Sequence, residues 1–350
     1  MIKLNSTSNI YIFAPANVAT GGPEALHQLN YYLKNTFNDL SSKIKLVYVG
    51  MNDDISPICE KYKKYNVEYI SEEQVIDDEN NVLIMPEIWT QKLNNYSRIQ
   101  KCIWWLSVCF YDGIKVDFWK KYIRSIFSAL KHLNFDSFKY WKDRKNYKKN
   151  CPDFTQACIY NFVGSKFAYD YLQKHQAKHV EYLVEPISKE FLDIGIAENL
   201  LSTERQDVVL YNPAKMSKRM EIILKRNGFD FVPLKGLSSK QLIEKYRSSK
   251  LYVDFGAFPG PERIPKETVY NGMVILVTKN NASVNDFDIA IPEKYKLLPK
   301  LSVKKVEEQM KYMLDNYDSI VDDFAAFREK IDNLENNFIA QIRNIFKFEE

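Results

Sequence analysis

Residues 9–33 read NIYIFAPANVATGGPEALHQLNYYL, which predicts a strand, a turn and a helix in direct succession. Asn9–Ala14 is a short run of β-branched and aromatic residues, as is typical of a strand. Thr20–Pro23 then predicts a glycine turn, and Pro23 suits the first turn of a helix because no N–H is needed there. The helix is indicated by apolar residues at helical spacing: Leu26, Leu29 and Leu33.

The same alternation of strand and helix continues along the chain. Strands are expected at Asn9–Ala14, Lys45–Val49, Val82–Met85, Lys101–Val108, Ile159–Val163 and Val180–Val184, and then at Val208–Tyr211, Phe231–Leu234, Leu251–Phe255 and Met273–Thr278. Helices are expected at 55–65, 93–99, 116–133, 165–174, 217–227, 238–249, 266–271, 303–316 and through much of 319–348. Strands that alternate with helices predict parallel sheets covered on both faces.

The pattern weakens between residues 185 and 207 and then restarts, so a domain boundary is placed there. A chain of 350 residues is also long enough for two domains. We therefore expect an α/β protein with two doubly wound, Rossmann-like domains facing across a cleft. The predicted ranges are 1–190 for the N-terminal domain and 191–325 for the C-terminal domain. A C-terminal helix, 326–350, is expected to pack back toward the N-terminal domain.

Composition excludes several classes of protein. The chain is 45% hydrophobic and 27% charged, which argues against disorder, and 11 glycines and 13 prolines argue against a fibrous protein. The N-terminus lacks a signal-peptide pattern, and apolar runs such as Cys102–Phe110 are too short to cross a bilayer. The five cysteines show no metal-ligand spacing, so free thiols in a cytoplasmic protein are expected, with no metal and no cofactor.

Two segments fall where parallel strands end, which is where α/β domains bind ligands. Gly21 and Gly22 open a helix whose amides can attract a phosphate, although a plain turn explains this pair as well. The second segment, 255–267, reads FGAFPGPERIPKE and presents Glu262 and Arg263 on a proline-rich loop before a short helix. A rigid loop loses little entropy when it binds a ligand, and the alternative is a surface loop with a salt bridge.

The Gly21–Glu24 turn, the Pro259–Arg263 loop with Lys266 and Glu267, and the pair Asn271–Gly272 resemble retaining nucleotide-sugar glycosyltransferases of the GT-B fold. The likeness is greatest to bacterial enzymes of capsule and lipopolysaccharide synthesis, in the group 1 type, and its specific part lies within 205–290. The resemblance implies a glycosyltransferase that moves a hexosyl or related sugar from a nucleotide sugar to a saccharide or lipid-linked acceptor in cell-surface polysaccharide synthesis. The alternative left open is a non-catalytic GT-B-like protein that binds a sugar nucleotide or serves as a scaffold.

The resemblance also implies roles for particular residues. The N-terminal domain is expected to bind the acceptor and the C-terminal domain the nucleotide sugar. Glu267 is expected to bind the ribose hydroxyls of the donor. Asn212 and Lys215 are expected to face the diphosphate, with Lys215 as the main candidate. Residues 231–235 are expected to pass near the nucleobase. The full set expected at the donor is Gly21, Gly22, Asn212, Lys215, Pro233, Leu234, Gly260, Pro261, Arg263, Ile264 and Glu267.

Catalytic roles are assigned to Lys215 and Glu262. The family commonly has two glutamates separated by seven residues, but the first position here is Pro259, so Glu262 is expected to take that role beside the transferred sugar. Metal-independent, retaining transfer needs no strong general base, because the leaving phosphate can accept the proton of the acceptor. An inverting enzyme would need a base in the first domain, for which Glu24 and His27 are available.

Residues 115–150 are basic and rich in aromatic side chains. They hold eleven Lys or Arg against three Asp, a charge of +8 within a chain whose total is +4. Basic and aromatic residues favour an anionic membrane surface, so peripheral association with the inner face of the cytoplasmic membrane is expected. The alternative is a solvated helix with its aromatic rings in the core. A nucleic-acid partner is not expected, since no recognition motif is present.

Overall fold

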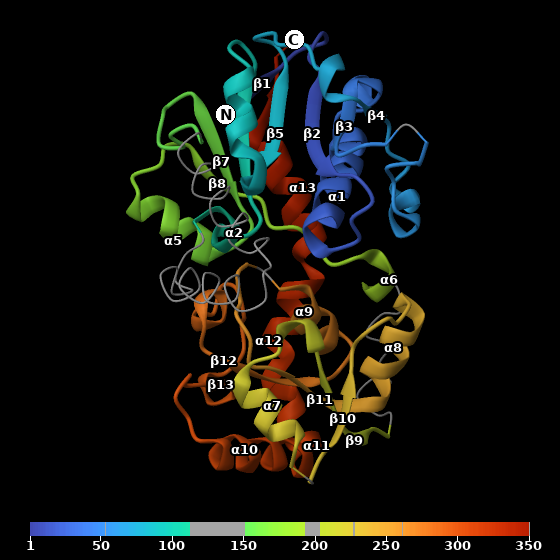
Figure 1. Ribbon diagram of the computed structural model, residues 1–350, viewed down its shortest axis with the longest axis vertical. Helices are drawn as coiled ribbons and strands as arrows, with labels where there is room; N and C mark the ends of the chain where they lie inside the picture. Colours follow the sequence, from blue (N-terminus) through green and yellow to red (C-terminus); the bar gives the residue numbers. More distant parts are fainter. Residues whose placement is uncertain (53, 113–150, 193–203, 227, 261, 350) are drawn as a thin grey trace, which may run out of the picture. The chain divides into compact units, whose positions relative to one another are not determined.

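The computed structural model describes residues 1–52, 54–112, 151–192, 204–226, 228–260 and 262–349. The chain forms two compact units, each considered by itself below (Figure 1). The first unit consists of Met1–Gly164, Ala168–Glu185 and Phe338–Glu350, and the second of Ser165–Phe167 and Pro186–Asn337. Residues 115–150, and with them the predicted helix at 116–133 and the basic aromatic segment, lie outside the described residues.

The first unit is built on a parallel sheet of seven strands in the order β4-β3-β2-β5-β6-β7-β8. These strands are β2 (Ile10–Pro15), β3 (Ile44–Val49), β4 (Tyr69–Ile70), β5 (Val82–Pro86), β6 (Gln100–Trp105), β7 (Ile159–Val163) and β8 (Val180–Tyr182). Its helices are α1 (Gly21–Thr36), α2 (Val108–Asp112), most of α5 (Lys166–Lys174) and short 3₁₀ turns η1 (Asn38–Lys43), η2 (Glu60–Tyr65), η3 (Glu72–Gln74) and η4 (Glu87–Asn95). The direction of strand order reverses between β2 and β5, which makes their carboxyl ends a topological switch point.

The side chains of this sheet are buried in the way expected of a parallel sheet. Five of the six residues of β2 are buried, as expected for a parallel strand covered on both faces. Helix α1 packs its Leu26, Leu29 and Leu33 against the sheet. Trp104 on β6 is fully buried, and its indole N–H donates to the carbonyl of Leu183 at 3.0 Å, so its one polar atom is satisfied.

The two ends of the chain meet in the first unit. Strand β1 (Ile2–Leu4) pairs in parallel with β14 (Phe346–Phe348), with Ile2 opposite Phe346. Helix α13 (Leu334–Ile345) leads into β14 and contributes Phe338 and Ile342 to the core beneath α1. The ring of Phe338 stacks on Trp104 with the centroids 6.1 Å apart.

The second unit has a parallel sheet of five strands in the order β10-β9-β11-β12-β13. The strands are β9 (Gln206–Tyr211), β10 (Asp230–Pro233), β11 (Ser249–Asp254), β12 (Val274–Thr278) and β13 (Lys296–Leu297). The helices are α6 (Lys189–Leu192), η5 (Pro213–Lys215), α7 (Lys218–Leu224), α8 (Ser239–Ser248), α9 (Arg263–Tyr270), η6 (Asn281–Val284), η7 (Glu293–Tyr295), α10 (Val303–Asp315), α11 (Tyr317–Ile320), η8 (Val321–Phe324) and α12 (Ala325–Asp332). Here the strand order reverses between β9 and β11, so the carboxyl ends of these two strands form the switch point of this unit.

A buried arginine ties the helices of the second unit together. The guanidinium of Arg205 donates to the carbonyl of Tyr246 at 2.7 Å, of Ser249 at 2.9 Å and of Asn271 at 2.7 Å. Tyr246 belongs to the last turn of α8, and Asn271 is the C-cap of α9. A cation is favourable there, because the last carbonyls of a helix have no partner within the helix.

Because Gly272 has no side chain, the guanidinium of Arg205 has room beside it. Its φ of +85° lies in the left-handed region, and a Cβ atom would lie 2.4 Å from Nη2 of Arg205. Tyr317 donates its hydroxyl to the carbonyl of Gly272 at 2.5 Å. The end of helix α9 is therefore held by two side chains from elsewhere in the unit, Arg205 and Tyr317.

The α/β class and the parallel sheets are confirmed, and several local predictions need correction. The predicted helix at 55–65 is a 3₁₀ turn over Glu60–Tyr65 only, and the one predicted at 93–99 is instead η4 at Glu87–Asn95. The region 319–348 is broken into α11, η8, α12, α13 and the strand β14 rather than one long helix. Across the described residues no helix is both long and apolar enough to span a bilayer.

Candidate functional site

The loop after β9 presents Lys215 at the switch point of the second unit. The side chain of Asn212 accepts from the backbone N–H of Ala214 at 3.0 Å and so caps the turn η5. Pro213 occupies the first position of this turn, where no N–H donor is required. Asn212, predicted to lie at the ligand, thus has a visible role in shaping the loop that carries Lys215.

Lys215 lies between two carboxylates that come from different segments. Its ammonium forms an ion pair with Glu262 and lies 3.7 Å from Oδ2 of Asp254. The side chain of Asp254 is 2% exposed, whereas those of Glu262 and Lys215 are 17% and 22% exposed. The two residues assigned catalytic roles from sequence, Lys215 and Glu262, are therefore in direct contact. Asp254 was not predicted, although an acid at the end of the apolar strand LYVDF was a signal for it.

Burial sets the acid–base properties of this cluster. It raises the pKa of both Asp254 and Glu262, and the neighbouring Lys215 ammonium opposes that rise in each case. Asp254 also accepts from the hydroxyl of Tyr252 at 3.2 Å and from the backbone N–H of Gly256 at 3.0 Å. With these donors Asp254 is held in place, whereas Glu262 is the more exposed member of the pair.

Gly256 allows the two loops of the switch point to touch. A Cβ atom at this position would lie 2.8 Å from the carbonyl oxygen of Lys215 and 3.0 Å from its Cβ. Any other residue would push the loops after β9 and β11 apart. The glycine is thus required for the contact between Lys215 and the acids.

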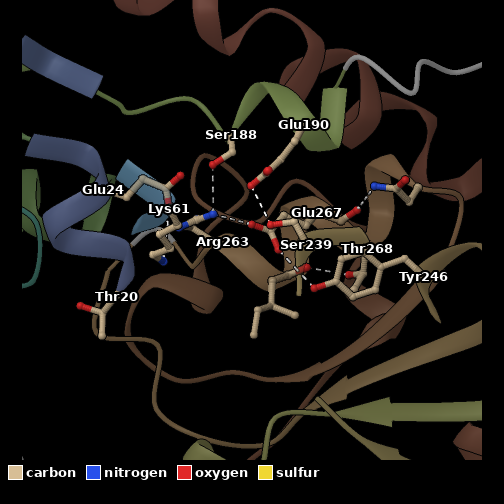
Figure 2. A network of polar contacts seen from close by, with 12 residues as sticks. Thr20, Glu24, Lys61, Ser188, Glu190, Ser239, Tyr246, Arg263, Glu267 and Thr268 are labelled. Atoms are coloured by element: carbon tan, nitrogen blue, oxygen red, sulfur yellow. Dashed lines mark hydrogen bonds and ion pairs between the residues drawn. The ribbon is translucent and has the colours of Figure 1, made fainter. Parts of the chain in front are cut away.

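Helix α9 carries a second polar network around Glu267. Figure 2 shows the carboxylate between two donors: Arg263 donates to Oε1 at 2.9 Å, and the hydroxyl of Tyr246 donates to Oε2 at 3.2 Å. Arg263 also reaches the hydroxyl of Ser188 at 3.4 Å. The side chain of Glu267 is 4% exposed, so its position is well defined by these partners. Arg263 and Glu267, both predicted for the donor site, are thus brought together.

The remaining predicted residues of the second unit are more scattered. Gly260 is buried, Ile264 is half-buried in the first turn of α9, and Pro261 lies outside the described residues. Pro233 is the exposed last residue of β10, and Leu234 follows it with its N–H donating to the carbonyl of Tyr211 at 2.9 Å. Both lie at the carboxyl end of β10, a strand that neighbours β9.

In the first unit, Gly21 and Gly22 are the first two residues of α1, after the N-cap residue Thr20. Glu24 is buried in the same turn, where it accepts from the hydroxyl of Tyr65 at 3.1 Å and lies 3.6 Å from the ammonium groups of Lys61 and Lys64. This carboxylate is an integral part of the packing between α1 and η2.

His27 is held as a neutral ring. Its Nδ1 lies 2.6 Å from the carbonyl oxygen of Pro23, which can only accept, so Nδ1 carries the proton. Its Nε2 therefore accepts from the hydroxyl of Tyr48, also at 2.6 Å. Burial lowers the pKa of His27 to about 4. Because both ring nitrogens are occupied in a buried position, the geometry gives no support to His27 as a base for an acceptor.

The neutral state of His27 predicts a pH-dependent stability. Between pH 6.5 and about 4 the unfolded chain binds a proton that the folded one does not, so the free energy of unfolding should fall as the pH falls through this window. The full effect is on the order of 3 kcal/mol. We expect urea denaturation to show a smaller loss between pH 7 and pH 4.5 for His27→Gln than for the wild type, while His175→Gln, at an exposed site, behaves like the wild type. Equal losses in His27→Gln and the wild type would contradict this assignment.

Glu87 is a buried acid that the sequence did not single out. It follows β5 at the switch point of the first unit and accepts from the backbone N–H groups of Leu106 and Ser107, each at 3.1 Å. Burial raises its pKa to about 8 despite these donors. Among the described residues there is no group of three or more His, Cys, Asp or Glu that could hold a metal ion.

Comparison with solved structures identifies the fold. Sucrose-phosphate synthase from Thermosynechococcus elongatus superimposes with a TM-score of 0.57 at 12% identity over 98% of each chain. WaaG, a glycosyltransferase involved in lipopolysaccharide biosynthesis, superimposes with a TM-score of 0.54 at 11% identity over 96% of this chain and 98% of that one. The chain has the GT-B fold. This confirms the α/β class expected from the strand and helix pattern and the GT-B fold that the resemblance implies.

A third solved structure was determined with a nucleotide. S. aureus TarM, in a complex that includes UDP, superimposes with a TM-score of 0.50 at 12% identity over 78% of this chain and 57% of that one. No protein-family model matches the sequence. No curated protein matches it either.

Proposed function

We propose that this protein is a glycosyltransferase that moves a sugar from a nucleotide-sugar donor to a saccharide or lipid-linked acceptor in the synthesis of a cell-surface polysaccharide. The observation that carries the proposal is the contact of Lys215 with Glu262 at the switch point of the second unit's sheet. Ligands of open α/β sheets bind at such points. The likeness in fold to glycosyltransferases supports the same conclusion.

The residues of the second unit suit a nucleoside diphosphate. Lys215 would face the diphosphate and compensate the negative charge that develops on it as the bond to the sugar breaks. Glu267 would bind the ribose hydroxyls, since a carboxylate has about four acceptor sites and can keep Arg263 and Tyr246 as partners. Pro233 and Leu234 would contribute backbone contacts near the base. Gly21 and Gly22 are assigned to the same ligand.

We propose a metal-independent, retaining transfer. The bond between the anomeric carbon and the phosphate oxygen breaks, and the acceptor hydroxyl forms a new bond to that carbon from the same face. Its proton passes to the departing diphosphate, so no protein base is needed. Glu262, the more exposed acid of the cluster, would lie beside the transferred sugar.

The acceptor side of the proposal rests on the first unit. Residues 1–190 are assigned to the acceptor, 191–325 to the donor, and 326–350 to a helical return toward the N-terminal domain. The basic aromatic segment 115–150 is proposed to contact anionic lipid at the cytoplasmic face of the membrane. Flotation of the protein with anionic vesicles, reduced by salt and by Lys→Glu changes in this segment, would support that contact.

Calorimetric titration of the full chain with UDP, GDP and CMP tests the donor site directly. We expect one of them to bind with a Kd in the micromolar range, about −8 kcal/mol. Incubation with the matching nucleotide sugars should then release the free nucleotide. If none of the three binds, the donor site is wrong. If one binds but no nucleotide sugar is consumed with any acceptor, the chain is a binding protein with this fold.

A further inference from the structure

Among the residues that the structure describes, the ammonium of Lys266 is buried without a hydrogen-bond partner. This residue lies in α9 immediately before Glu267 and is only 4% exposed. Within the part of the chain that the structure describes, no atom accepts a hydrogen bond from its Nζ. Burying an unpaired charge costs several kcal/mol, so a lysine in this state needs an explanation.

Two carboxylates lie near enough for their charges to interact with Lys266, and both are engaged elsewhere. Glu262 is the N-cap residue of α9, four positions before Lys266, and its carboxylate contacts Lys215 instead. Asp288 accepts from Nδ2 of Asn285 at 2.8 Å and from the backbone N–H groups of Lys166 and Phe167, at 2.7 and 3.0 Å, in the same unit. Lys330, the other cation nearby, donates to the carbonyl of Phe287.

Glu262 thus interacts electrostatically with two lysines and forms its ion pair with Lys215. If a diphosphate binds Lys215, the carboxylate of Glu262 loses its partner and repels the phosphate oxygens. Lys266 is then the cation that can form an ion pair with the Glu262 carboxylate. Before the diphosphate binds, Glu262 forms its ion pair with Lys215. After binding, Lys215 pairs with the diphosphate, and Lys266 pairs with Glu262.

We infer that Lys266 is a positioning residue, which takes the Glu262 carboxylate when a diphosphate displaces it from Lys215. The inference rests on the proposed function, because it requires a diphosphate at Lys215. Lys266 itself does not touch the ligand. It acts by removing Glu262 from the phosphate and by fixing that carboxylate one helical turn away.

The free protein gives the first test. Lys266→Met removes a buried charge that has no hydrogen-bond partner among the described residues, so the midpoint of urea denaturation should stay the same or rise. Lys296→Met is the matched control, since the fully buried Lys296 pairs with Asp286 at 2.7 Å and donates to the carbonyl of Asn285 at 3.2 Å. Its midpoint should fall. A fall for Lys266→Met as large as that for Lys296→Met would overturn the inference.

Ligand binding gives the second test, through a double-mutant cycle. With the tightest-binding of UDP, GDP and CMP, Lys266→Met should weaken binding by about tenfold in the wild-type background, because Glu262 keeps competing for Lys215. In the Glu262→Gln background, Lys266→Met should have no effect on binding, because there is then no carboxylate that competes with the diphosphate for Lys215.

The two tests separate the possible failures. Equal weakening of nucleotide binding by Lys266→Met in both backgrounds would show a purely structural role. That result would contradict the inference and leave the proposed function standing. No weakening in the wild-type background would also overturn the inference. If none of the three nucleotides binds the wild type, the proposed function fails and takes the inference with it.

Discussion

Replacing Lys215 with methionine is expected to lower the rate of sugar transfer by two to three orders of magnitude, the usual loss when one group that stabilises developing charge is removed. Lys215 is the cation that the loop after β9 presents at the switch point, at 22% exposure. Methionine keeps the length and apolar stem of lysine but cannot compensate the charge on the leaving diphosphate. Steady-state measurement of nucleotide release checks the prediction.

Control variants show whether the loss is local. Lys225→Met makes the same substitution at the exposed C-cap of α7 and should retain the wild-type rate. The Lys215→Met variant should stay folded, because burial already raises the pKa of Asp254 and Glu262 and both can take up a proton once the ammonium is gone. A rate within threefold of the wild type would remove Lys215 from the proposed mechanism.

Arg205→Met should be the most destabilising single change that the second unit's packing suggests. It leaves three buried carbonyls, those of Tyr246, Ser249 and Asn271, without their donor. At about 1 to 3 kcal/mol for each unsatisfied buried group, a loss of at least about 3 kcal/mol in the free energy of unfolding is expected. Urea denaturation at pH 7 measures it.

The control for Arg205 is the same substitution on the surface. Arg226, whose side chain is 52% exposed, pairs with Glu307 at 2.9 Å, and Arg226→Met should cost less than about 1 kcal/mol. A similar small loss for Arg205→Met would mean that water replaces the guanidinium at all three carbonyls. Because Tyr246 also donates to Glu267, Arg205→Met should in addition weaken nucleotide binding.

Much of the fold is predictable from local patterns. Buried parallel strands such as β2, β5 and β12 appear in the sequence as apolar runs bounded by turn residues, and each was predicted to within a residue or two of its observed range. By contrast, β1 and β14 were missed because each has three residues and depends on a partner at the other end of the chain. The 3₁₀ turns near residues 60 and 90 were mistaken for helices or misplaced, since their spacing resembles that of one helical turn.

The sequence indicates which residues belong to the candidate site, but not which of them contact one another. Lys215, Glu262, Arg263 and Glu267 stand out because charged residues in proline-rich or strand-ending segments are unusual. What the sequence could not show is which charges pair. That Glu262 contacts Lys215 rather than Lys266 depends on how the loops after β9 and β11 meet at Gly256. The burial of Asp254 and Lys266 depends on the same tertiary arrangement.

The pairing of β1 with β14 has a consequence for how the chain is made. The first unit uses residues from both ends, whereas nearly all of the second is the continuous stretch Pro186–Asn337. During synthesis the second unit can therefore complete its core while the first still lacks Phe338, Ile342 and the partner of its opening strand. Strand β14 is made long after β1, whose pairing it completes, so a nascent chain stalled near residue 337 would expose apolar surface in a part that was made much earlier.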